Sequence, residues 1–101
     1  MTIEQDIDKL QYNINRAQRA KDVLENEVFI EAFDLISNEV YEQWKTSPSR
    51  DAEGREKLHQ YHSMLQKVKA HLQTTMDTGK LARIDLDHKK SLLERSKDAM
   101  R

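Results

Sequence analysis

The stretch from Glu27 to Trp44, EVFIEAFDLISNEVYEQW, most constrains what this chain can fold into. It contains both phenylalanines, one of the three tyrosines and the only tryptophan. Its apolar residues recur at steps of three and four, which places them on one face of a 3.6-residue helix. We expect this aromatic face to lie in the core. Its central residues are Phe29, Phe33, Ile36, Val40 and Trp44.

The composition favours a few long helices. Of the 101 residues, 37% are hydrophobic and 35% are charged, with only two glycines and one proline. Because an amphipathic helix buries only a stripe, it needs fewer apolar residues than a compact mixed fold. The sequence therefore predicts an all-α protein, an antiparallel helical hairpin or a small three- to four-helix bundle with coiled-coil-like seams. We expect one helical domain over residues 1–101.

Two capping signals delimit the first half of the chain. Thr2 and Gln5 fit the capping box, in which a hydroxyl residue is followed three positions later by Glu or Gln. Asn26 fits the N-cap of a second helix, so we favour a break after Leu24 over one continuous helix of more than 40 residues.

The clearest turn lies at 46–49, Thr-Ser-Pro-Ser, almost at the midpoint. Proline suits the first turn of a new helix, with Ser47 or Ser49 as its cap. Gly79 then fits a C-cap, because glycine often ends a helix there. The predicted helices cover about 2–24, 27–45, 50–78 and 81–99.

Two further stripes follow helical spacing. The first, near the N-terminus, forms a heptad seam that suits either an internal core or self-association; its candidate self-association residues are Ile3, Ile7, Leu10 and Ile14. The second is expected to pack on the aromatic face as the other half of the core, and its residues are Leu58, Leu65, Val68 and Leu72. In the last segment, the face that could pack is formed by Leu81, Ile84, His88 and Leu92.

The one constellation with possible chemistry is Glu56, His59 and His62, spaced three residues apart. An E-x-x-H pair is the inward motif of di-iron bundles, but those sites need a second such pair, and this sequence has none. The chain also lacks cysteine. We therefore expect no catalytic residue, no bound cofactor and no metal, and interpret the protein as not an enzyme.

The charges nearly balance, with 17 basic and 18 acidic residues and a formal net charge of −1. Bulk charge does not indicate nucleic-acid binding. One local cluster contains possible phosphate contacts, namely Lys89, Lys90, Arg95 and Lys97. No apolar run approaches the roughly 20 residues of a membrane span. The acidic start MTIEQDIDKLQ is not a signal peptide, so we expect a cytoplasmic protein that does not contact a membrane.

Residues 24–82 carry a recognisable pattern. It consists of an E-A-F segment, a tryptophan before a T/S-P turn, and the stretch RDAEGREKL. In this order they resemble a group of small helical proteins encoded by tailed bacteriophages. The resemblance implies a phage product in the host cytoplasm, without an enzymatic activity to carry over. In size and in its antiparallel helical pair, the chain also resembles small terminase subunits. Those commonly begin with a helix-turn-helix, whereas residues 2–24 here read as one heptad helix.

Three functions remain open from the sequence. The first is a non-enzymatic, self-associating phage protein that binds another, unidentified protein in phage assembly or host takeover. The second is a small-terminase-like DNA-packaging adaptor, a ring that contacts DNA through basic residues. The third is an inhibitor of a host defence protein.

Overall fold

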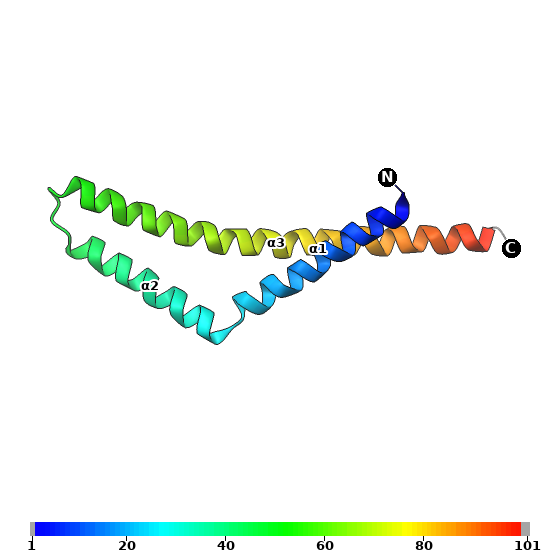
Figure 1. Ribbon diagram of the computed structural model, residues 1–101, viewed down its shortest axis with the longest axis horizontal. Helices are drawn as coiled ribbons and strands as arrows, with labels where there is room; N and C mark the ends of the chain where they lie inside the picture. The colour runs from blue at the N-terminus through cyan, green and yellow to red at the C-terminus, as the bar shows by residue number, and fades with distance from the viewer. Residues whose placement is uncertain (1, 100–101) are drawn as a thin grey trace. The chain divides into compact units, whose positions relative to one another are not determined.

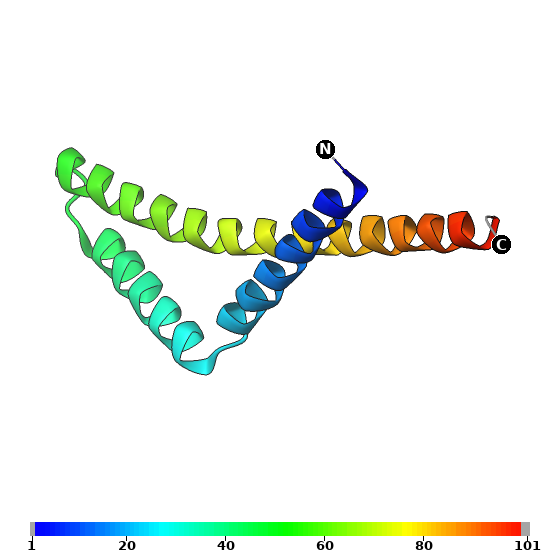
Figure 2. The same cartoon turned by 45° about the vertical axis from the view of Figure 1, so that its right-hand side comes forward.

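The computed structural model describes residues 2–99 and is all-α. Within this range it contains three helices and no strand: α1 (Ile3–Leu24), α2 (Glu27–Thr46) and α3 (Ala52–Ala99) (Figures 1 and 2). The contacts divide into two compact units. Unit 1 combines Met1–Lys21 with Gln73–Arg101, and unit 2 is Asp22–Leu72, so that α3 contributes to both. The predicted fold class is confirmed, while a single domain over 1–101 stays a prediction.

Both predicted N-terminal caps are present. Thr2 N–H donates to Gln5 Oε1 at 3.1 Å, and Gln5 N–H donates to Thr2 Oγ1 at 3.2 Å. This reciprocal pair satisfies two backbone donors that have no partner within the helix. At the start of α2, Asn26 Oδ1 accepts from Phe29 N–H at 3.0 Å. The break between α1 and α2 therefore lies where the sequence predicted it.

The turn between α2 and α3 is capped differently from the prediction. Ser47 ends α2, because its N–H donates to Trp44 O at 3.3 Å and its hydroxyl donates to the same oxygen at 2.6 Å. Asp51 lies directly before α3, and its Oδ1 accepts from Gly54 N–H at 3.1 Å. Neither Ser47 nor Ser49 therefore caps the third helix, although the sequence predicted one of them as the cap, and this helix starts at Ala52 instead of 50. A carboxylate is favoured there because it also meets the positive end of the helix dipole.

Gly79 does not end a helix. The sequence predicted a break between 78 and 81, but α3 continues from Ala52 to Ala99, and Gly79 has no positive φ. Instead it lies buried against Asn13 and Ala17 of α1. A Cβ on Gly79 would overlap that of Ala17 and would lie 3.2 Å from Asn13 O. The glycine is needed because it lets two backbones approach closely.

Small residues around this crossing form the core of unit 1. The buried side chains are Ala20 and Ala82, each 4% exposed, and Leu86, which is fully buried. The predicted seam on α1 packs inward here: Ile7, Leu10 and Ile14 are half-buried, and Ile3 is exposed. Half-burial within unit 1 fits the first interpretation of the seam, and self-association through these residues stays a prediction. The predicted packing face on the last segment is wrong, since its apolar members Leu81, Ile84 and Leu92 are exposed.

Unit 2 is the expected antiparallel hairpin, made of α2 and the first part of α3 (Figures 1 and 2). Its predicted core residues differ in exposure. The half-buried ones are Phe29, Phe33, Val40, Leu58, Leu65 and Leu72, whereas Ile36, Trp44 and Val68 are exposed. None of its residues is buried. Two helices alone cannot enclose large side chains from every direction, so each of these side chains keeps one flank in solvent.

The tight crossing predicts that Gly79→Ala destabilises unit 1. Alanine is the better helix former by about 1 kcal/mol, but overlap with Ala17 costs more. We expect a net loss of roughly 1–2 kcal/mol in the free energy of unfolding, measured by thermal melting at one protein concentration.

Two variants serve as controls for this prediction. Ala17→Gly added to Gly79→Ala removes the overlapping Cβ, and we expect it to recover part of the loss. Thr78→Ala changes an exposed neighbour and leaves the melting temperature nearly unchanged. A Gly79→Ala protein as stable as the parent would contradict the close approach.

Candidate functional site

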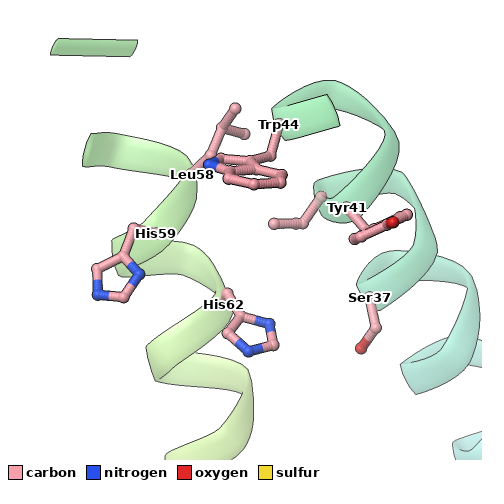
Figure 3. Close-up of a pocket in the computed structure, with 7 residues that line it drawn as sticks. Ser37, Tyr41, Trp44, Leu58, His59 and His62 are labelled. Atoms are coloured by element: carbon pink, nitrogen blue, oxygen red, sulfur yellow. The ribbon is translucent and has the colours of Figure 1, made fainter. Parts of the chain in front are cut away.

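A groove of about 240 Å³ opens on one side of the unit 2 hairpin, beside the single tryptophan (Figure 3). Four of its residues come from α2 and three from α3: Ser37, Val40, Tyr41, Trp44, Leu58, His59 and His62. The Trp44 ring lies between the two helices, next to Leu58. We call this the Trp44 groove. Its walls are mainly apolar, so it suits an apolar group more than a charged one.

Arg55 holds the closed end of the hairpin. Its guanidinium lies over the Trp44 ring, 4.7 Å from the centroid. Its Nη1 donates to Ser47 Oγ at 3.0 Å and to the carbonyl oxygens of Trp44 and Ser47, both at 3.4 Å. The last carbonyls of a helix lack intrahelical donors, so Arg55 of α3 supplies one to the end of α2. Trp44 is therefore held in place although 43% of it is exposed.

Ser37 occupies an inward position that the sequence assigned to Ile36. The half-buried stripe of α2 runs from Phe33 to Ser37 and then to Val40. Its step after Phe33 is four residues long, whereas the predicted stripe used a step of three to Ile36. Ser37 Oγ is buried and has no hydrogen-bond partner within residues 2–99. A buried hydroxyl without a partner is unfavourable. Ser37 thus lines the Trp44 groove while its hydroxyl oxygen points away from solvent.

The other side of the same hairpin is also grooved. A depression of about 410 Å³ is lined by Ile36, Glu39, Val40, Gln43, Tyr61, Met64, Leu65 and Val68. We call the exposed large residues of this depression the apolar side, which comprises Ile36, Tyr61, Met64 and Val68. They are between 47% and 58% exposed.

Deeper between the helices, the aromatic rings have partial cover. The Phe29 and Phe33 centroids lie 5.9 Å apart, and Lys69 Nζ lies 5.2 Å from the Phe33 centroid. Contact of this kind between a cation and an aromatic face is favourable while leaving the ammonium in water. This part of the hairpin is therefore closed by a charged side chain in place of a third helix.

The predicted phosphate-contact cluster lies on the last turns of α3. Lys89 already pairs with Asp85, with Nζ and Oδ1 3.0 Å apart, and it is half-buried. Lys90, Arg95 and Lys97 are exposed. Part of the cluster's charge is thus neutralised within its own helix.

Two of the three residues of the histidine motif contribute to the Trp44 groove. His59 and His62 line the groove, while Glu56 lies exposed. In the part of the chain that the structure describes, no group of three or more His, Cys, Asp or Glu residues is placed to hold a metal ion. Sequence reasoning did not identify Arg55, whose role depends on how the turn brings it against Trp44.

Comparisons of the chain with protein-family models, curated proteins and solved structures gave no match. The resemblance to phage proteins and to small terminase subunits therefore stays a prediction. Among the described helices, none is sufficiently long and apolar to cross a membrane.

The Arg55 contacts predict a graded loss of stability. Arg55→Ala removes both the ring contact and the donor, and we expect it to cost roughly 1–2 kcal/mol. Arg55→Lys retains a donor but lacks the planar guanidinium, so it should cost about half as much. Thermal melting measures both, and acrylamide quenching of the only tryptophan reports how far Trp44 becomes accessible.

Arg50→Ala is the matched control, because Arg50 is an exposed arginine in the same turn. It should leave both stability and quenching unchanged. Equal quenching in the parent and the Arg55→Ala protein would show that Arg55 does not hold Trp44.

Proposed function

We propose that this chain is a non-enzymatic protein that self-associates and acts by binding another protein, in phage assembly or host takeover. The phage setting comes from the resemblance of residues 24–82. The observation that carries self-association is that unit 2, Asp22–Leu72, has no buried residue although it contains both phenylalanines and the only tryptophan.

Hydrophobic burial supports this proposal. Fully burying a large apolar side chain contributes about 1.5–3 kcal/mol relative to leaving it exposed. In unit 2 that contribution is only partly realised, because ten of its large hydrophobic residues are exposed. A second chain that covers them adds the missing contribution. Association and stability of the hairpin are then coupled, as in obligate oligomers.

The accessible surface of the chain supports the same proposal. It amounts to 8218 Å², whereas a compact monomer of 11.9 kDa exposes roughly 6,000 Å². The difference, about 2,200 Å², exceeds the roughly 800 Å² that each partner loses in a standard interface. A chain of this size therefore has enough uncovered surface for a stable assembly.

The alternative of a DNA-packaging adaptor has less support. It requires a basic surface, but Glu94 lies within the candidate cluster and Asp85, just before it, pairs with Lys89. No observation favours a host-defence inhibitor over other protein binders. Both alternatives stay predictions.

Self-association is tested by multi-angle light scattering and sedimentation across a range of micromolar concentrations. We expect a mass of at least twice 11.9 kDa. We also expect a melting temperature that rises with concentration, because association stabilises the folded state by mass action. A monomer with a cooperative melt at every concentration contradicts the proposal. A parallel binding assay with duplex DNA, titrated with salt, tests the alternative, since phosphate contacts weaken steeply as salt rises.

A further inference from the structure

We infer that the outer face of α2 in one copy docks into a basic cleft between α1 and α3 in another copy. This inference rests on the proposed self-association and names the two surfaces that perform it. Its ground is charge complementarity, because the charges of the chain are distributed unevenly among its helices.

The near-zero net charge conceals a separation of charge between helices. The α2 helix has five acidic residues and one basic residue, whereas α3 has seven acidic and ten basic residues. In α1, four acidic residues balance four basic ones. Two copies can therefore attract each other through unlike helices, although each chain as a whole is nearly neutral.

A cleft of about 460 Å³ lies between α1 and α3 within unit 1. Its cations are Lys21 from α1 and Lys80 and Arg83 from α3, and no acidic residue of the described chain lines it. All three cations are exposed, and within residues 2–99 none of them forms an ion pair. Asp77 and Asp87 lie about one turn away on α3 but outside the lining. The other lining residues are Ile14, Ala17, Gln18, Met76, Gly79 and Ile84.

We call this the basic cleft. Its mainly apolar floor gives contact for an apolar side chain, and its cations give contact for carboxylates. A partner that satisfies both is an acidic amphipathic helix. A nucleic-acid backbone would satisfy only the cations, and no aromatic residue lines the cleft for base stacking.

The charge of the basic cleft distinguishes it from the other depressions. Another depression between α1 and α3 mixes two acidic residues with two lysines, among them the paired Asp85 and Lys89. Neither groove of unit 2 has a lysine or an arginine among its described lining residues. Of these four depressions, only the basic cleft has several cations without an acidic residue among them. Charge complementarity therefore selects it for an acidic partner.

The outer face of α2 supplies such a partner. Its residues recur at steps of three and four on the side of the helix away from Phe33 and Val40. They are Val28, Glu31, Leu35, Asn38 and Glu42, which we call the outer stripe. All five are exposed, Val28 by 72% and Leu35 by 64%, and none is a cation. In its own chain α2 belongs to unit 2, whereas every residue of the basic cleft belongs to unit 1.

The lengths of the two surfaces agree. Met76 and Ile84 are about 12 Å apart along α3, and Glu31 and Glu42 are about 16 Å apart along α2. Leu35 lies between the two glutamates, so it can contact the apolar floor while they reach the cations. A third helix in this position covers a flank that a pair of helices leaves open. Because each copy has both surfaces, the contact is heterologous and can be repeated between copies.

Charge reversal tests both surfaces. Lys80→Glu with Arg83→Glu makes the basic cleft acidic, and Glu31→Lys with Glu42→Lys makes the outer stripe basic. Each double variant sets like charges against each other. We expect each to raise the dissociation constant of self-association by roughly a hundredfold, measured by sedimentation. The four substitutions together restore unlike charges at the parent's net charge, and association should return to within about tenfold of the parent.

Lys90→Glu with Lys97→Glu is the matched control, because it reverses two exposed cations of α3 outside the cleft. It has the same net charge as the cleft variant and should associate as the parent does. Circular dichroism checks that every variant remains helical. Association that survives both reversals, or that the fourfold exchange does not restore, would overturn the inference.

The apolar part of the contact is tested at Leu35. Leu35→Ser removes the side chain proposed to contact the floor, and we expect it to raise the dissociation constant by roughly tenfold. Leu81→Ser is its control, because Leu81 is 69% exposed and does not line the cleft. It should change the constant little. Equal effects of the two substitutions would count against docking of the outer stripe.

The outcomes separate this inference from the proposed function. If the parent protein is a monomer at every concentration, self-association itself fails. If the parent associates and both charge-reversal variants associate equally well, only the assignment of the two surfaces is wrong.

Discussion

A pair of packed helices leaves solvent on both flanks, and this constraint governs both units of the protein. In unit 1 the constraint is met with small residues. Gly79 has no Cβ to overlap Ala17, so the two backbones approach closely, and Ala20, Ala82 and Leu86 become buried. In unit 2 the facing residues are large, and none of them is buried. The same two-helix geometry therefore gives one closed crossing and one open hairpin.

Local signals in the sequence predicted local structure well. The capping box of Thr2 and Gln5 and the Asn26 cap depend on atoms within three residues of one another, so they can be recognised without knowledge of the rest of the fold. Gly79 was misassigned because a glycine that ends a helix and one that admits a neighbouring helix are identical in sequence. Only the position of Ala17 on another helix distinguishes them.

The candidate site was predicted in outline and missed in detail. The stripe at 27–44 identified the hairpin face, but a helix with steps of three and four allows either Ile36 or Ser37 to point inward. Apolar character favoured Ile36, and the structure places Ser37 there. Leu86 was overlooked for a related reason. Apolar residues lie on two sides of α3, so its periodicity did not indicate which side α1 covers.

The open hairpin also explains how the cations of unit 2 are used. Arg55 and Lys69 lie over Trp44 and Phe33, covering aromatic surface that a third helix would otherwise bury. Such side chains remain hydrated at their charged ends and do not need another protein. The apolar side has no equivalent cover, since its exposed residues face water directly. Even beside these cations the aromatic residues stay partly open to solvent, since Trp44 is 43% and Tyr41 57% exposed.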